Sequence, residues 1–121
     1  MMDVVTVVDI NLVALTEPDR DKRAALIEKA WAEDGSLTDP PLVGVGYDGL
    51  HKFAETVCEH YAGQKFRRVT DVDVHHDRFR YEWELVAPDE TVTVAGIDVG
   101  DLAPDGRLHT VTGFFGKLPR T

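Results

Sequence analysis

Apolar residues recur at helical intervals in the first half of the chain, and their spacing predicts three helices. The first stripe places four residues on one helical face, namely Val5, Val8, Leu12 and Leu15. The third stripe is the clearest, and the glycine after it, Gly63, favours the end of a helix. Its members are Leu50, Phe53, Ala54, Val57, Cys58 and Tyr61.

A second helix is expected to begin within residues 16–19. Pro18 fits a first helical turn, and the acids beside it favour the positive end of a helix. The apolar stripe of this helix consists of Ala24, Ile27, Ala30 and Trp31. Residues 33–35 carry a glycine and are expected to end the helix.

A short strand, residues 36–39, is expected to follow. Proline cannot donate to a strand ladder, so the pair Pro40-Pro41 should stop this strand. The residue before a proline is driven toward extended geometry, which gives Asp39 a well-defined direction. Residues 44–46 are interpreted as a flexible loop.

From residue 64 onward the apolar period changes to two, which predicts a meander of long strands. They cover residues 65–75, 78–87, 91–101 and 107–116, with a turn at His76-Asp77. In the second strand one face is apolar and carries Phe79, Tyr81, Trp83 and Leu85. The last two strands are apolar on both faces. Their outer face is therefore expected to meet a second subunit in a homodimer.

Three helices followed by a strand meander indicate an α+β fold, with the helices packed on the concave side of a curved sheet. The length of 121 residues is that of one domain spanning residues 1–121. The net charge of -9, from 22 acids and 13 Lys and Arg, disfavours nucleic acid as a partner. No apolar run approaches the ~20 residues that span a bilayer, and the acidic N-terminus is unlike a signal peptide, so a cytoplasmic protein is expected.

Two acids interrupt apolar surroundings, Asp39 before the prolines and Asp98 in the segment VAGIDVG. A buried carboxyl group has a raised pKa, which is what a general acid or base near neutral pH requires. Two plainer interpretations stay open. Asp39 could be a turn residue that bonds to nearby backbone amides, and Asp98 could be a solvated edge position.

The sequence carries no metal-binding or cofactor-binding motif, so none is expected. In His75-His76-Asp77 adjacent strand residues point to opposite faces, which indicates a hairpin turn and not a metal site. A phosphate-binding glycine loop and a Ser-His-Asp or Cys-His signature are also missing. The single cysteine, Cys58, has no internal disulfide partner and is interpreted as a buried thiol.

The segments AWAEDGSLTDP and AGIDVGDLAPDGRLHTVTGFFG resemble the ketosteroid isomerase branch of the nuclear transport factor 2-like superfamily, which includes the SnoaL-like polyketide cyclases. The resemblance spans nearly the whole chain. It implies a cone-shaped fold around a deep apolar pocket, with Asp39 as the general base and Asp98 as a second, protonated aspartate. The isomerases also have a tyrosine on the first helix, and Asn11 takes its place here.

The resemblance also suggests which side chains face a ligand. His109 shares strand parity with residues that would face the pocket, and it is expected there as an auxiliary donor with Asn11. The aromatic residues expected in the core or the pocket wall are Trp31, Phe53, Tyr61, Trp83 and Phe115. Two functions stay open: a cofactor-free isomerase or cyclase acting on a cyclic or polyketide-like carbonyl compound, and a non-catalytic module that binds a small apolar or aromatic ligand or dimerises.

Overall fold

The computed structural model describes residues 2–121, within which the chain forms three helices and seven strands. The helices are α1 (Val4–Ala14), α2 (Arg20–Ala30) and α3 (Gly46–His60). The strands are β1 (Trp31–Thr38), β2 (Val43–Val45), β3 (Lys65–Arg68), β4 (Asp73–His75), β5 (Arg78–Val86), β6 (Val92–Leu102) and β7 (Leu108–Phe115).

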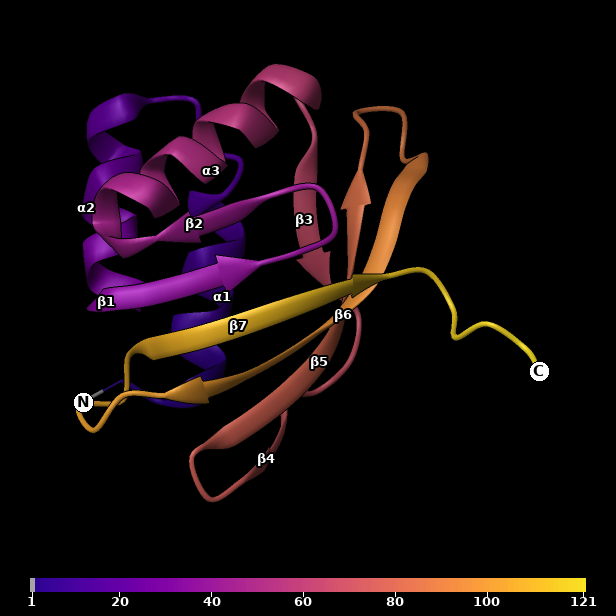
Figure 1. Ribbon diagram of the computed structural model, residues 1–121. Helices are drawn as coiled ribbons and strands as arrows, with labels where there is room; N and C mark the ends of the chain where they lie inside the picture. Colours follow the sequence, from indigo (N-terminus) through magenta and orange to yellow (C-terminus); the bar gives the residue numbers. More distant parts are fainter. Residues whose placement is uncertain (1) are drawn as a thin grey trace.

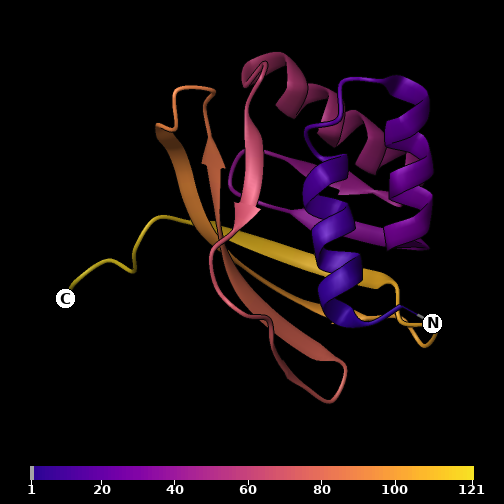
Figure 2. The same ribbon diagram turned by 180° about the vertical axis from the view of Figure 1, so that it is seen from behind.

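The strands form one open sheet in the order β2-β1-β7-β6-β5-β3, with β4 also paired to β5. Strands β1 and β7 run parallel, and the other pairs are antiparallel. The three helices lie together on one side of the strongly bent sheet (Figure 1). From behind, α1 crosses in front of the sheet (Figure 2). The predicted α+β fold, with helices packed on a curved and mainly antiparallel sheet, is confirmed.

Aspartates cap the first two helices. The Asp3 carboxylate accepts a hydrogen bond from the Thr6 amide at 2.9 Å, and the Asp19 carboxylate accepts one from the Lys22 amide at 2.9 Å. Such caps satisfy backbone donors that have no partner within the helix. The inward face of α1 is rotated from the predicted one, because Val5 is 38% exposed while Val7, Val8, Asn11 and Leu12 are buried.

The second helix ends earlier than predicted. It stops at Ala30, and the residues expected in its last turn belong to β1. Trp31 already has extended backbone angles, and the pairing of β1 with β7 shifts register between Trp31 and Ser36. Gly35 allows this irregularity, since a Cβ there would lie 2.6 Å from Cε3 of Trp31. Strand pairing has overridden the local preference for helix.

Two further strand predictions are wrong. Residues 43–45 form β2, which pairs with β1, and are not a flexible loop. Gly44 packs so closely on α3 that an added Cβ would lie 2.7 Å from the Gly49 carbonyl oxygen. Residues 65–75 form two short strands and not one, because the chain leaves the ladder between them while both strands still pair with β5. There the Thr70 hydroxyl accepts a hydrogen bond from the Glu82 amide.

The core lies between the helices and the inward face of the sheet. As predicted, the alternating residues of β5 are buried there, namely Phe79, Tyr81, Trp83 and Leu85. The opposite face leaves Ile97, Val99 and Phe114 exposed on β6 and β7. Within residues 2–121 no helix has both the length and the apolar character needed to cross a bilayer.

Candidate active site

Asp98 lies on the inward face of β6, and two donors hold its carboxylate. The Tyr81 hydroxyl donates to Oδ2 at 2.6 Å, and Nε1 of Trp83 donates to Oδ1 at 2.9 Å. Both donors come from β5, whose register sets Tyr81 directly opposite Asp98. Asp98 is only 6% exposed and is not a solvated edge residue.

Burial is the dominant influence on this carboxyl group. Removal from water raises the pKa of Asp98 to about 6, and the hydrogen bonds from Tyr81 and Trp83 lower it only in part. The negative charge of Asp39 adds a smaller upward effect on the pKa of Asp98. The two carboxyl groups are therefore close enough for the ionisation of one to depend on the other.

Asp39 follows the last residue of β1 in a tight turn. Its backbone amide donates to the Leu42 carbonyl oxygen at 2.9 Å, and the Leu42 amide approaches Oδ1 at 3.2 Å. The side chain is half-buried, and burial raises its pKa to about 6 against the lowering effect of the Leu42 amide. Asp39 thus has the hydrogen bond to a nearby backbone amide that is expected of a turn aspartate. It also has the raised pKa that is expected of a general acid or base.

A glycine brings the two acids together. Gly113 of β7 pairs with Asp98, while the β1 pairing next to Asp39 joins Thr38 with Thr112. A Cβ added to Gly113 would lie 3.0 Å from Oδ1 of Asp98 and 3.2 Å from Cβ of Asp39. The absence of a side chain at this position lets both carboxyl groups approach the same space.

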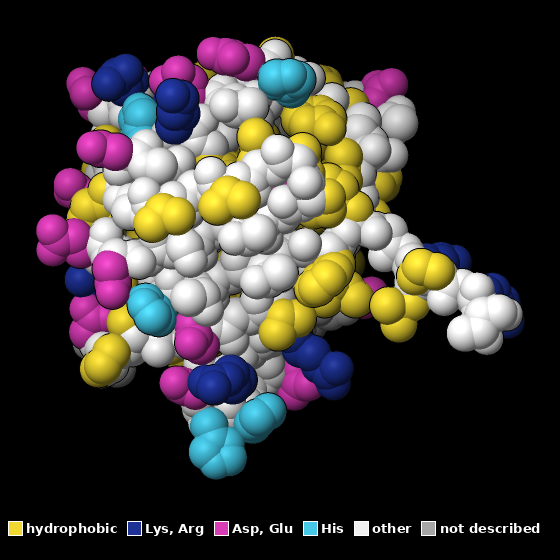
Figure 3. All heavy atoms as spheres, in the orientation of Figure 1, with side chains coloured by type: hydrophobic (Ala, Val, Ile, Leu, Met, Phe, Trp, Pro, Cys, Tyr) yellow, Lys and Arg dark blue, Asp and Glu magenta, His cyan; other side chains and the backbone are white. Residues whose placement is uncertain are grey.

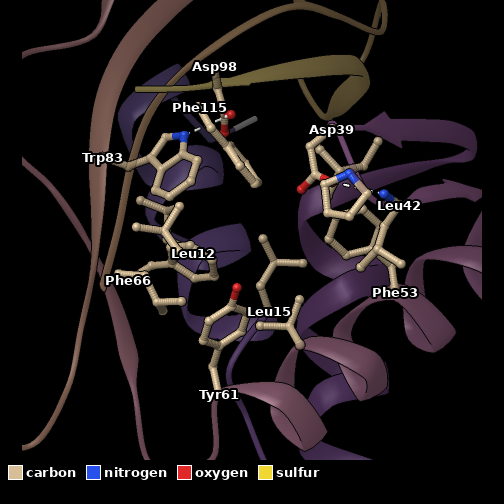
Figure 4. A pocket seen from close by; sticks show the side chains of 15 residues that line it. Leu12, Leu15, Asp39, Leu42, Phe53, Tyr61, Phe66, Trp83, Asp98 and Phe115 are labelled. Atoms are coloured by element: carbon tan, nitrogen blue, oxygen red, sulfur yellow. Dashed lines mark hydrogen bonds between the residues drawn. The ribbon is translucent and has the colours of Figure 1, made fainter. Parts of the chain in front are cut away.

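That space is a cavity of about 60 Å³ between the helices and the sheet. Asp98 and Asp39 enter it from the sheet side and Tyr61 from the opposite side (Figure 4). The other lining side chains are almost all apolar, namely Leu12, Leu15, Leu37, Pro41, Leu42, Phe53, Val57, Phe66, Trp83, Leu85, Val94 and Phe115. Among residues 2–121, no Lys, Arg or His lines the cavity.

Of the aromatic residues expected in the pocket wall, Phe53, Tyr61, Trp83 and Phe115 line the cavity. Phe115 contacts Trp83 edge-on, with ring centroids 5.6 Å apart. Trp31 is fully buried elsewhere in the core and does not line the cavity, so of the two expected places it takes the core.

Asn11 does not face the cavity either. Its Oδ1 accepts a hydrogen bond from Nε1 of Trp31 at 2.8 Å, and both side chains are completely buried. Its Nδ2 is buried without a hydrogen-bond partner in the part of the chain that the structure describes. The residue that replaces the isomerase tyrosine is thus a core residue that does not line the cavity, so the structure does not bring it together with Asp39 and Asp98.

His109 was expected in the pocket, and it lies outside. Its Nε2 is 3.5 Å from Oδ2 of Asp34, and its Nδ1 is 3.6 Å from Oδ1 of Asp101. The register of β6 and β7 shifts between Asp101 and Leu102, which breaks the alternation on which the prediction rested. The parity rule fails at such an irregularity.

Two positions of the candidate site were not predicted from the sequence. Tyr81 was assigned to the core, although pairing the two neighbouring strands in an antiparallel hairpin would have placed it opposite Asp98. Gly113 gave no signal of its own, because its importance depends on the parallel pairing of β1 with β7. Within residues 2–121 no group of three or more His, Cys, Asp or Glu side chains could hold a metal ion.

Comparison with known structures places the chain in a family. A candidate isomerase of the SnoaL-like family from Agrobacterium tumefaciens is 31% identical and superposes with a TM-score of 0.88, covering 97% of this chain and 100% of that chain. The chain belongs to the SnoaL-like family. The resemblance seen in the sequence is therefore confirmed. No family model matches the sequence, and no curated protein matches it either.

More distant structures share the SnoaL-like fold. A nuclear transport factor 2-like protein from Exiguobacterium is 15% identical with a TM-score of 0.72, covering 93% of this chain and 99% of that chain. A candidate polyketide cyclase from Sinorhizobium meliloti is 13% identical with a TM-score of 0.68, with the same coverage of 93% and 99%. At these identities the likeness establishes the cone-shaped α+β fold alone.

Proposed function

We propose that this SnoaL-like protein is a cofactor-free isomerase or cyclase that moves a proton on a small cyclic or polyketide-like carbonyl compound. The observation that carries the proposal is the pair of carboxyl groups, Asp39 and Asp98, on one otherwise apolar cavity. Burial raises the pKa of each carboxyl group to about 6. A general acid or base works best when its pKa lies close to the pH of the reaction, and a pKa of about 6 is close to neutral pH. The relative described as an isomerase adds support at the level of the family.

Asp39 is the better placed base. It sits in the turn at the edge of the cavity and has a single weak hydrogen bond to its carboxylate, so one oxygen is free to accept a proton. Asp98 is held by Tyr81 and Trp83 and serves as the second proton carrier. The base must be ionised, so the rate is expected to rise as the pH passes about 6, the pKa of Asp39.

The size of the cavity bears on the substrate. Its volume of about 60 Å³ is below the ~150 Å³ of an engineered apolar cavity that holds benzene. A ring-sized substrate therefore requires side chains at the rim to move. Phe115 is 38% exposed and Leu42 lies in the turn after β1, so both can move without opening the core. A single ring suits this space better than a steroid.

The experiment uses a β,γ-unsaturated cyclohexenone, whose isomerisation to the conjugated ketone requires removal and return of one proton. The wild-type protein is expected to accelerate the rise in ultraviolet absorbance, and Asp39→Asn to lower the rate by at least about 100-fold. Asp101→Asn is the matched control, since Asp101 lies on β6 but outside the cavity. Equal rates for wild type and Asp39→Asn would contradict the proposal.

Two observations favour a second function. Both oxygens of Asp98 already accept hydrogen bonds, and the isomerase tyrosine is replaced by a core asparagine, so the cavity could bind a ligand without reacting. The fluorescence of Trp83, which lines the cavity, reports binding of the conjugated cyclohexenone. Binding without any isomerisation by the wild-type protein would favour this non-catalytic module.

We also propose a homodimer formed through the outer face of β6 and β7. On that face Ile97 pairs with Phe114 across the two strands, and both are exposed together with Val99. Hydrophobic side chains are visible over the face that carries β1, β2 and β7, while acidic side chains gather along one edge (Figure 3). An apolar strand face of this kind is commonly covered by a partner.

A further inference from the structure

One hydroxyl group in the cavity has no partner among residues 2–121. Tyr61 follows the last turn of α3, and its side chain extends into the cavity with the hydroxyl directed toward the side on which Asp39 and Asp98 lie (Figure 4). None of the hydrogen bonds formed by the described side chains involves this hydroxyl. A phenol that faces an apolar space without a partner is ready to donate to a ligand.

The other donors near the carboxyl groups are occupied. The Tyr81 hydroxyl and Nε1 of Trp83 both donate to Asp98. Asn11, the counterpart of the isomerase donor, is buried against Trp31 and does not line the cavity. Tyr61 therefore supplies the one uncommitted side-chain N–H or O–H donor that lines the cavity within residues 2–121, apart from a protonated carboxyl group.

The charge of the cavity restricts the ligand. Its ionisable lining groups are two carboxyl groups and one phenol, with no cationic side chain among the described residues. An anionic ligand would bring a further negative charge into a poorly hydrated space, where like charges repel strongly. An uncharged ligand with a hydrogen-bond acceptor avoids this repulsion and matches the free phenol.

From these contacts we infer that Tyr61 donates a hydrogen bond to the carbonyl oxygen of an uncharged ketone, whose acidic C–H group faces Asp39 and Asp98. The catalytic part of this inference rests on the proposed function. In a β,γ-unsaturated ketone the ionised Asp39 carboxylate takes a proton from the α carbon. The electron pair of that C–H bond forms a C=C bond to the carbonyl carbon, and the C=O π electrons move onto the oxygen. Tyr61 stabilises this enolate oxygen. When the C=O bond re-forms, the double bond moves from the β,γ to the α,β position, and the Asp39 carboxyl group returns its proton to the γ carbon.

The test compares wild type with Tyr61→Phe, using the conjugated cyclohexenone with an isotopically labelled carbonyl group as the probe. In difference infrared spectra the carbonyl stretch of the bound probe is expected at lower wavenumber in wild type than in Tyr61→Phe. Loss of one neutral hydrogen bond should weaken binding of the ketone about 3- to 10-fold. Cyclohexene, which has the ring but no acceptor, should bind both proteins equally.

Tyr47→Phe is the matched control, since it removes a hydroxyl from the other end of α3. The Tyr47 hydroxyl donates to the Trp31 carbonyl oxygen and lies outside the cavity lining. This variant is expected to leave the carbonyl stretch of the bound ketone unchanged, even where it lowers the stability of the fold.

Three results would overturn the inference: an unchanged carbonyl stretch in Tyr61→Phe, equal weakening of ketone and cyclohexene, or no binding of the ketone to wild type. The outcome is separable from that of the proposed function. A shifted carbonyl stretch without isomerisation supports the contact of Tyr61 and contradicts catalysis. Isomerisation with an unchanged stretch in Tyr61→Phe supports catalysis and contradicts the role of Tyr61.

Discussion

Replacing Asp98 by asparagine should stabilise the fold at alkaline pH. Burial raises the pKa of Asp98 in the folded protein, whereas in the unfolded chain it returns to about 3.8. Ionisation therefore opposes folding, and stability falls as the pH rises from about 3.8 through 6. Asparagine cannot ionise but preserves the contacts: its Oδ1 accepts from Trp83 and its Nδ2 donates to the Tyr81 oxygen.

The size of the effect follows from the pKa. A value of about 6 in place of 3.8 corresponds to a destabilisation of about 3 kcal/mol at pH 8. At pH 4 the folded carboxyl group is protonated and the unfolded one is about half ionised, so the difference shrinks to about 0.5 kcal/mol. A change of about 3 kcal/mol is a large share of the total stability of a small domain.

Urea denaturation at the two pH values measures this difference. At pH 8 the midpoint of Asp98→Asn should exceed that of wild type by about 2 M for an m value of about 1.5 kcal/mol/M, and at pH 4 the curves should nearly coincide. Asp101→Asn is the control of opposite sign. Burial raises the pKa of Asp101, but the Thr110 donors and the charges of His109 and Arg78 together leave it lowered, so its loss should destabilise at pH 8.

A stability gain that is equal at pH 4 and pH 8 would show that it does not come from a buried ionised carboxyl group. No gain at pH 8 would refute the reasoning directly, because Asp98 would then ionise in the folded protein as it does in water.

Two further predictions concern the sheet. Gly113→Ala should lower the isomerisation rate by about 10-fold or more, with only a small loss of stability in urea. The reason is that the new methyl group moves the Asp98 carboxylate by a few tenths of an ångström. An unchanged rate would show that the spacing of Gly113 and the two carboxyl groups is unimportant. Light scattering at micromolar concentration should give wild type twice the chain mass of 13.5 kDa. Phe114→Glu, which places a charge on the exposed apolar face of β7, should give the mass of a monomer. A monomeric wild type would contradict the proposed dimer.

Much of the fold could be read from regular patterns. The stripe of α3 and the alternation of β5 were predicted correctly, because amphipathic periodicity records which face each element buries. The end of the strand before the prolines was predicted to within one residue, since β1 ends at Thr38 and proline acts locally on the residue before it. The family resemblance predicted that Asp39 and Asp98 belong to one site, which the apolar periodicity alone does not indicate.

The errors arose where distant contacts decide the local structure. The end of α2 was misplaced because β1 pairs with β7, some 75 residues later in the chain. His109 was misassigned because a register shift between β6 and β7 leaves no trace in the apolar pattern. Asn11 was expected to face a ligand, but it accepts a hydrogen bond from Trp31 instead. That hydrogen bond depends on how α1 packs against β1. None of these contacts follows from neighbouring residues.

The parallel pairing of β1 with β7 also bears on how the chain folds. Strand β7 lies between β1 and β6, so Asp39 and Asp98 come together only after a strand from the end of the chain has inserted between two earlier ones. This is a contact of high sequence separation, which forms slowly because a long loop must close first. Before insertion both carboxyl groups are hydrated and ionise independently. Asp39 and Asp98 therefore acquire their raised pKa values only when β7 inserts between β1 and β6 and completes the sheet.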